Sequence, residues 1–260
     1  MHLHESPSLG GILVALALAH GGCSPAHRPG APLLVAAASD LTVAFDDLAS
    51  AWARAGHPRP TVTFGSSGLL ATQITQGAPF DVFASANLSF AREAVHSGRC
   101  DGATLTHYAR GRVALCSRGG RIHSLSNLAD PGVTHVAIAN PEHAPYGRAA
   151  REALTTAGLW EAVHPKLVYG ENVQQTLQFV QSGNADVALV SQSLAMTSGL
   201  ACTVIDKSLH HPIDQVMVAC GHGPHTTEAR AFVAFVSSPA GRSILARHGF
   251  APPMASDGGE

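Results

Sequence analysis

Short apolar runs, each followed by apolar residues at helical spacing, recur along this chain and constrain its fold more than any other feature. The run "PLLVAAAS" (32–39) has the length of a buried strand, and the apolar residues of 41–52 after it recur at helical spacing. The same pattern returns at "TVTFGSS" (61–67) and "DVFASA" (81–86). Such alternation is typical of a mostly parallel sheet with helices on both faces.

A second series of strands and helices repeats this architecture. It begins at "RVALCS" (112–117), passes through "VTHVAIAN" (133–140) and reaches "DVALV" (186–190). Residues 226–249 then carry apolar residues on one face and are predicted to form one long helical segment. With no internal repeat or heptad array, the sequence predicts an α/β fold made of two units.

The charge balance limits the classes of partner. Of the 260 residues, 13% are charged and 45% are hydrophobic, and the formal net charge is -2. These values give no basic surface for nucleic acid, so we expect no nucleic-acid partner. An anionic ligand would have to be held by local groups.

The N-terminal residues have the features of an export signal. The apolar run Leu9–Ala19 is too short to span a membrane comfortably, and it is typical of a signal-peptide core. In "AHGGC", Cys23 is a candidate for lipidation, which would leave the residues up to 30 as a tether. A soluble leader that is cut nearby, with Cys23 discarded, is the alternative. Either way we expect an exported protein of the periplasm or cell envelope, attached to a membrane only if Cys23 is lipidated.

Four further cysteines follow the leader: Cys100, Cys116, Cys202 and Cys220. An even number in an exported chain permits disulfides, and four cysteines allow three pairings that the sequence does not separate. Free buried thiols are the alternative. No CxxC spacing is present, which argues against a zinc knuckle or a redox motif.

Polar groups stand at four strand-to-helix junctions: Ser39, the pair Ser66 and Ser67, Tyr146 and Val173. Ligands of open α/β sheets bind where such helices begin, and the unpaired N–H groups of a helix start bind anions without a cation. Taken singly, a serine here is a helix cap, the tyrosine a half-buried aromatic and the valine a core residue. Their joint placement indicates an anion site.

Five segments together resemble the periplasmic molybdate-binding proteins of ABC transporters. They are "VAAASDLTVAFDDLASAW", "FGSSGLLATQITQGAPFDVFASAN", "NPEHAPYGRAAREAL", "GENVQQTLQFVQSGNADVALV" and "ARAFVAFVSSPAGRSILARHGF". The resemblance covers the whole chain after the leader. It implies the two-lobed type II periplasmic-binding fold, in which each lobe has a mostly parallel sheet flanked by helices and two crossing hinge strands join the lobes.

The resemblance also implies a domain division. Residues 1–30 would be the signal peptide and tether, and residues 31–113 plus 221–260 would form lobe 1. Lobe 2 would then comprise residues 114–220, with the hinges near "RVALC" and "QVMVAC".

By this resemblance the oxygens of the anion are met by four residues. Ser39 would contribute its hydroxyl and backbone N–H, Ser67 its hydroxyl, Tyr146 the turn of "APYG", and Val173 the backbone of "GENV".

Two further residues are weaker candidates. The Asp40 N–H is expected to point to the ligand while its side chain points away. Ser191 stands where some relatives have a tyrosine, and its shorter side chain puts its contact with the ligand in doubt.

The implied function is an extracytoplasmic solute-binding protein that captures molybdate, and also tungstate, between its lobes and delivers it to an ABC permease. We expect a monomer with no cofactor, no cation ligands in the site and no catalysis. A cleft lined only by donors leaves the proton of a protonated phosphate without an acceptor, which costs roughly 1–3 kcal/mol. Sulfate is smaller and would be held loosely by a rigid cage.

Three alternatives remain open. The same fold can carry another anion, such as sulfate. A serine hydrolase would use Ser66 or Ser67 as nucleophile, although "GSSG" is not the GxSxG elbow and no base is adjacent in sequence. A metal-binding protein would use Cys220, His222 and His225, whose spacing is permissive for a transition metal.

Overall fold

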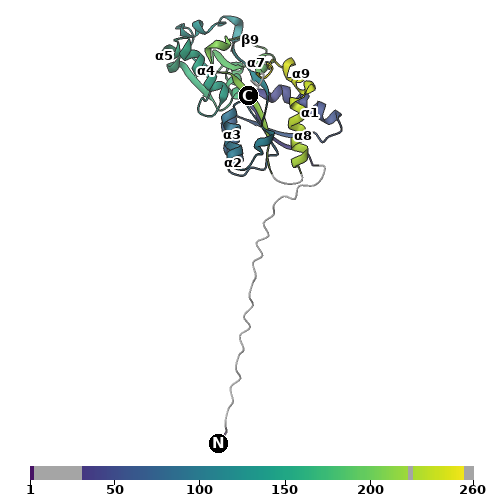
Figure 1. The fold of residues 1–260 in the computed structure, drawn as a ribbon. Coiled ribbons are helices and arrows are strands. Elements are labelled where there is room, and N and C mark those ends of the chain that lie inside the picture. The colour runs from purple at the N-terminus through teal and green to yellow at the C-terminus, as the bar shows by residue number, and fades with distance from the viewer. Residues whose placement is uncertain (3–30, 222–224, 255–260) are drawn as a thin grey trace, which may run out of the picture.

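Two five-stranded sheets form the centres of two lobes (Figure 1). The structure is a computed structural model, and it describes residues 1–2, 31–221 and 225–254. The predicted signal peptide, the tether and Cys23 lie outside the described residues. Within the described ranges, no helix is both long and apolar enough to span a bilayer.

The first sheet has the strand order β2-β1-β3-β10-β4. Its strands are β2 (Thr61–Gly65), β1 (Leu34–Ala38), β3 (Val82–Ser85), β10 (Ile213–Ala219) and β4 (Thr106–Gly111). Strand β1 pairs in parallel with β2 and β3, whereas β10 is antiparallel to both β3 and β4. Thus only β10 runs against the other strands, which agrees with the predicted mostly parallel sheet.

The second sheet has the order β7-β6-β8-β5-β9 and the same plan. Its strands are β7 (Leu167–Gly170), β6 (Val136–Ala139), β8 (Val187–Ser191), β5 (Val113–Ser117) and β9 (Ala201–Val204). Strand β6 pairs in parallel with β7 and β8, and β5 is antiparallel to β8 and β9.

Helices cover both faces of each sheet. Those of the first lobe are α1 (Thr42–Arg54), α2 (Ser67–Thr75), α3 (Leu88–His96), α8 (Thr226–Ser237) and α9 (Pro239–Arg247). Those of the second are α4 (Pro145–Thr156), α5 (Trp160–Val163), α6 (Val173–Ser182) and α7 (Gln192–Ala195). Short 3₁₀ turns are η1 (Ser39–Leu41), η2 (Gly102–Thr104), η3 (Arg118–Gly120), η4 (Leu125–Ala129), η5 (His164–Lys166) and η6 (Lys207–Leu209).

Alternation along β1 shows how the first sheet buries its two faces. Val35 and Ala37 pack with α1, α8 and α9, whereas Ala36 packs with α2 and α3. In Figure 1, α2 and α3 accordingly lie on one side of this sheet, and α1, α8 and α9 on the other. The apolar runs read from the sequence are therefore strands that are buried on both faces.

The connections between the lobes differ from the prediction at one place. The first connection between the sheets, from β4 to β5, passes through Arg112. The second runs between β9 and β10, over residues 205–212, because β10 pairs with β3 and β4. Assigning 114–220 to lobe 2 was therefore wrong for 213–219, whose strand belongs to the first sheet.

The predicted single helical segment 226–249 is two helices. Helix α8 ends at Ser237, and α9 begins at Pro239, a residue that is favoured at the first position of a helix. The Ser238 hydroxyl accepts a hydrogen bond from the Gly241 N–H and so caps α9. The sequence "SSP" (237–239) is typical of a helix start, but the apolar residues on both sides of it keep helical spacing and led to the prediction of one segment.

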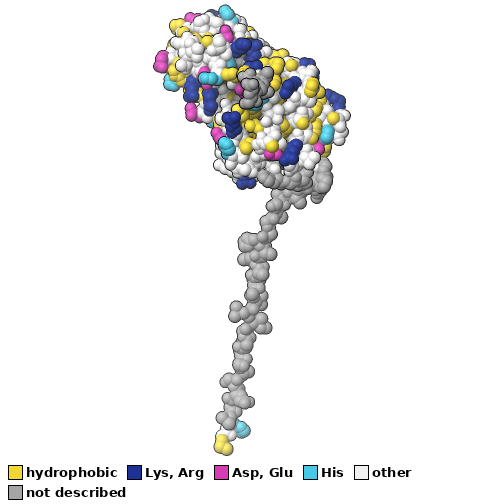
Figure 2. Space-filling model, viewed as in Figure 1, with side chains coloured by type: hydrophobic (Ala, Val, Ile, Leu, Met, Phe, Trp, Pro, Cys, Tyr) yellow, Lys and Arg dark blue, Asp and Glu magenta, His cyan; other side chains and the backbone are white. Residues whose placement is uncertain are grey.

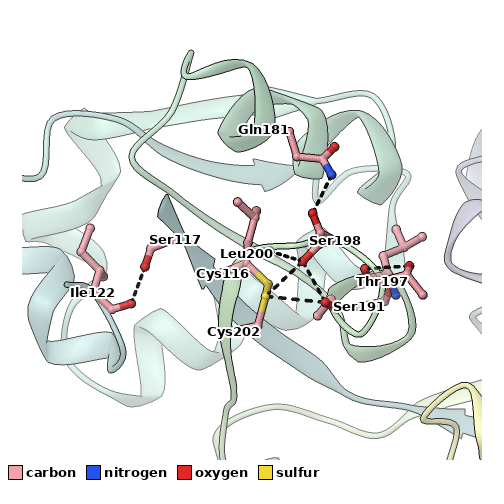
Figure 3. Close-up of a disulfide and its surroundings, with 11 residues drawn as sticks. Cys116, Ser117, Ile122, Gln181, Ser191, Thr197, Ser198, Leu200 and Cys202 are labelled. Carbon is pink, nitrogen blue, oxygen red and sulfur yellow. Dashed lines mark hydrogen bonds between the residues drawn. A yellow bond between two sulfur atoms is a disulfide. The ribbon is translucent and has the colours of Figure 1, made fainter. Parts of the chain in front are cut away.

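Each lobe contains one disulfide between adjacent segments. Cys100 bonds to Cys220, and Cys116 bonds to Cys202 across the β5–β9 pair. Figure 3 shows the second bond beside the turn that carries Ser198. The alternative of free thiols is wrong for this structure.

The disulfides also bear on the metal alternative. A disulfide-bonded Cys220 is not available as a thiolate ligand. His222 lies outside the described residues. Among the residues that are described, no group of three or more His, Cys, Asp or Glu side chains is arranged to hold a metal ion.

Candidate functional site: a buried cavity between the lobes

A small cavity lies where both lobes meet. Its volume is about 10 Å³, roughly the space needed for one water molecule, and thus far below the roughly 300–1,000 Å³ of typical pockets for organic ligands. Its lining residues are Ala38, Ser39, Asp40, Gly65, Ser66, Ser67, Ala86, Ala144, Pro145, Tyr146 and Val173. The four site residues expected from the sequence are thus brought together, and none of the lining residues is Lys or Arg.

The site is closed to solvent in this structure. Val173 is 4% exposed, and Ser39, Ser67 and Tyr146 are even less exposed. Lysine and arginine side chains are instead spread over both lobes of the visible surface (Figure 2). Hydrogen-bond donors in the cavity therefore act in a low-dielectric environment, where they are stronger than in water.

The two serines at the start of α2 have different contacts: Ser66 precedes the helix, Ser67 is its first residue, and neither hydroxyl caps it. The Ser67 Oγ accepts a hydrogen bond from the Ala86 N–H at 3.0 Å, which leaves its own proton free to donate. The Ser66 Oγ lies 2.9 Å from His143 Nδ1, across the lobe interface. The cap interpretation of Ser67 is wrong, because its side chain joins α2 to the end of β3.

Ser39 is also not a helix cap. It is the first residue of η1, and Leu41 precedes α1 as the N-cap residue. In the described part of the chain, the Ser39 hydroxyl makes no hydrogen bond, while its carbonyl accepts one from Thr42 Oγ1. Ser39 is a buried residue that lines the cavity, so its hydroxyl is free to donate to a ligand.

The start of α6 leaves one backbone donor at the cavity. Asn172 Oδ1 accepts hydrogen bonds from the N–H groups of Gln174 and Gln175. The N–H of Val173, the residue directly after Asn172, is not capped in this way. The first N–H groups of a helix have no partner within the helix. Val173 lines the cavity, so its N–H is a candidate ligand donor.

Tyr146 does not offer its hydroxyl proton to the cavity as arranged here. Its Oη donates to Asp40 Oδ2 at 2.8 Å and links α4 of the second lobe to η1 of the first. Since Tyr146 is the second residue of α4, its backbone N–H is free of helical partners, as expected of a helix start.

Asp40 departs from the expectation that its side chain points away. The residue is 0% exposed and lines the cavity, and its Oδ2 also accepts a hydrogen bond from Gln215 Nε2 at 2.7 Å. Loss of solvent raises the pKa of the Asp40 carboxyl to about 7, and the hydrogen bonds from Tyr146 and Gln215 offset only part of this effect. Tyr108 Oη donates to Gln215 Oε1 and so orients the amide.

The structure places Ser191 outside the cavity lining. Its Oγ accepts a hydrogen bond from the Leu194 N–H and caps α7, and it lies 2.9 Å from Ser193 Oγ. The Ser193 hydroxyl in turn donates to the Asp40 carbonyl at 2.7 Å. Ser191 therefore supports a contact between the lobes in this structure.

Other contacts also hold the lobes together. The Gly68 N–H donates to the His143 carbonyl at 2.9 Å, a close approach that a Cβ at Gly68 would obstruct. The absence of a side chain at Gly111 makes room for the Tyr146 hydroxyl, because a Cβ on residue 111 would overlap it.

Sequence reasoning missed Gln215, His143, Ser193 and Gly111. Gln215 and Gly111 come from strands β10 and β4, whose positions depend on long-range pairing, and no local motif marks these residues. Polar Gln215 within the apolar "PIDQVMVAC" was the one signal that could have been read as a buried polar role.

The contact between Ser66 and His143 is relevant to the hydrolase alternative. In the described chain, the other ring nitrogen of His143 makes no hydrogen bond to a carboxylate, so the third member of a triad is absent there. Ser66 is 3% exposed and the bond crosses the interface between the lobes. The pair fits a closing contact better than a nucleophile and its base.

Known proteins share both the sequence and the fold. The family model described as "Bacterial extracellular solute-binding protein" matches residues 33–251. The molybdate-binding protein ModA of Rhodobacter capsulatus is 33% identical over 238 residues, which cover 91% of this chain and 94% of that protein. ModA of Azotobacter vinelandii is 31% identical over 250 residues, covering 94% and 98%.

A solved structure agrees with these matches. The periplasmic molybdate-binding protein of Azotobacter vinelandii superposes with a TM-score of 0.79 and 27% identity, over 85% of this chain and 99% of that chain. The predicted two-lobed, type II periplasmic-binding fold is confirmed. The chain belongs to the bacterial extracellular solute-binding protein family.

Proposed function

We propose that this protein captures molybdate in the cavity between its lobes and delivers it to the permease of an ABC transporter. The observation that carries the proposal is the convergence of free donors from both lobes on a buried cavity with no cationic lining residue. Helix starts carry a partial positive charge of roughly +0.5, which favours an anion there. The relatives named as molybdate-binding proteins support the choice of anion.

Each lobe is assigned its own donors. The first lobe contributes the hydroxyls of Ser39 and Ser67, with the backbone N–H groups at the start of η1. The second lobe contributes the N–H groups of Tyr146 and Val173, at the starts of α4 and α6. Because one ligand bonds to both lobes, its binding stabilises the closed form, as in hinge-bending binding proteins.

Selectivity follows from the same donors. Tungstate has nearly the size and charge of molybdate and is proposed as a second ligand. Sulfate is smaller and would leave some donors without a good partner, and an unpaired buried donor costs about 1–3 kcal/mol.

The remaining assignments concern the cell. We assign the protein to the periplasm or cell envelope as a monomer without catalytic activity, with lipidation at Cys23 as its route to the membrane. The two lobes are assigned to residues 31–111 with 213–254 and to residues 113–204, in line with the sheets.

Calorimetric titration of the mature protein with molybdate, tungstate, sulfate and phosphate, each in the same buffer, tests the proposal. We expect tight binding of molybdate and tungstate and much weaker binding of the other two. Sulfate that bound as tightly as molybdate would contradict the choice of cargo.

A further inference from the structure

A carboxyl group lies in a cavity that otherwise offers donors. Asp40 lines the cavity beside Ser39, and its side chain is completely buried. An ionised carboxylate beside a bound dianion would place like charges together without solvent, which is strongly unfavourable. The carboxyl group therefore needs a chemical role that is compatible with an anion.

The hydrogen bonds of Asp40 are unevenly shared between its two oxygens. Both side-chain donors, Tyr146 Oη and Gln215 Nε2, bond to Oδ2, at 2.8 and 2.7 Å. Oδ1 is buried and makes no hydrogen bond of normal geometry with any described residue, while the backbone N–H groups of Asp40 and Leu41 act on the carboxyl group and partly offset the effect of burial on its pKa. This is the pattern of a carboxylic acid whose carbonyl oxygen is Oδ2 and whose hydroxyl oxygen is Oδ1.

We infer that Asp40 binds the oxyanion as a neutral carboxylic acid, with the Oδ1 hydroxyl donating a hydrogen bond to a ligand oxygen. This inference rests on the proposed function. The proton comes from the solvent, bonds to Oδ1 as the lobes close and returns to the solvent when the ligand leaves. Binding of one molybdate would thus take up one proton.

The titratable and charged groups around Asp40 must also be considered, because they could change the protonation of the site. The titratable groups that face it are the phenols of Tyr146 and Tyr108, and burial raises the pKa of both phenols well above the ordinary value. The turn η1 packs on α1, α6, α7 and β2, and the Asp40 carboxyl also bonds to Tyr146 of α4 and Gln215 of β10. Of these elements, α1, α4 and β10 contain charged residues. On α1, Asp46 bonds to Arg59, Asp47 bonds to His248, and Arg54 lies in the last turn. The charged residues of α4 and β10 are Arg148, Arg151, Glu152 and Asp214.

The electrostatics of the closed form support the same protonation state. Burial raises the pKa of the Asp40 carboxyl to about 7 before the charge of any ligand is considered. A dianion in the adjacent cavity would raise this pKa further, because a nearby like charge disfavours the ionised form. In an open form the carboxyl would be solvated, with an ordinary pKa of about 3.9.

The test is calorimetric titration with molybdate at pH 8, in HEPES and in Tris, whose ionisation enthalpies differ. The difference in heat between the buffers gives the number of protons taken up. We expect about one proton per bound molybdate for the unmodified protein at this pH, and an affinity that falls by up to about tenfold per pH unit above about pH 7, where Asp40 is ionised before the ligand binds. Asp40→Asn carries a permanent donor, so proton uptake and the pH dependence of its affinity should disappear.

Two variants serve as controls. Asp214→Asn removes a half-buried carboxylate of β10 and should retain the uptake. His143→Gln removes the imidazole at the lobe interface, and it should also retain the uptake. Uptake that is lost in His143→Gln but kept in Asp40→Asn would overturn the inference.

Two other results would also overturn it. The first is tight molybdate binding without proton uptake, a result that would leave the proposed function intact. The second is tight binding of hydrogen phosphate without uptake, in which an ionised Asp40 accepts the proton of the ligand. Absence of molybdate binding at every pH would instead contradict the proposed function itself.

Discussion

Ser67→Ala is expected to separate ligand binding from helix stability. The Ser67 Oγ already accepts the Ala86 N–H at 3.0 Å, so the hydroxyl proton is free for the ligand. A hydrogen bond to a charged group contributes about 1.5–3 kcal/mol, and 1.4 kcal/mol corresponds to a tenfold change. We therefore expect the dissociation constant for molybdate to rise roughly 10- to 150-fold.

The same substitution also leaves the buried Ala86 N–H without its partner. This loss should lower the free energy of unfolding by about 1–3 kcal/mol, as measured by urea denaturation of the ligand-free protein. Binding and stability are thus measured separately, by calorimetry and by denaturation.

Ser66→Ala is the matched control. It removes a hydroxyl that contacts His143 across the interface but is not assigned to the ligand. Its affinity loss should correspond to one ordinary hydrogen bond, about 0.5–1.5 kcal/mol. An unchanged affinity in Ser67→Ala, or a larger affinity loss in Ser66→Ala than in Ser67→Ala, would contradict the assignment of Ser67 to the ligand.

Three further predictions concern closure and stability. In Gly111→Ala the new Cβ would overlap the Tyr146 hydroxyl. The molybdate affinity measured by calorimetry should therefore fall at least tenfold, which corresponds to about 1.4 kcal/mol. An affinity equal to that of the unmodified protein would show that the close approach of Gly111 and Tyr146 is not needed. The ligand-free protein should open as the pH rises through about 7. The raised pKa of the Asp40 carboxyl in the closed form stabilises that form at low pH. This stabilisation is lost as Asp40 ionises, by up to about 1.4 kcal/mol per pH unit. Small-angle scattering would detect the opening, and an identical pH response of Asp40→Asn would exclude this cause. Replacing Cys116 and Cys202 by serine removes one disulfide and should lower the free energy of unfolding by about 2–4 kcal/mol. A melting temperature that falls by only roughly 1–2 °C would correspond to a much smaller loss of stability and would contradict this prediction.

Much of the fold was predictable because its strands are buried and its helices amphipathic. Runs such as 34–38 and 187–190 are apolar on both faces, so they could be recognised without long-range information. The edge strands β4 and β9 were not predicted, since β9 is exposed along its length and lacks such a run. The sheet of β10 depends on pairing with β3 and β4, which no local pattern reports.

The site was predictable to the extent that it uses helix starts. Ser39, Ser67, Tyr146 and Val173 follow strands, and the parallel order of the sheets brings them together. The tasks of the hydroxyls were not predictable. Whether Ser67 caps α2 or bonds to Ala86 depends on the distance between α2 and β3, and the partners of Asp40 come from α4 and β10.

The central claim is that an oxyanion binds between the lobes, on donors from both. The most direct measurement is a crystal structure with molybdate, with anomalous data collected at the molybdenum edge. We expect one strong peak in the cavity, with ligand oxygens at hydrogen-bond distance from the Ser39 and Ser67 hydroxyls and the Val173 N–H. A peak elsewhere on the protein with the cavity empty, or ligand contacts to one lobe alone, would contradict it.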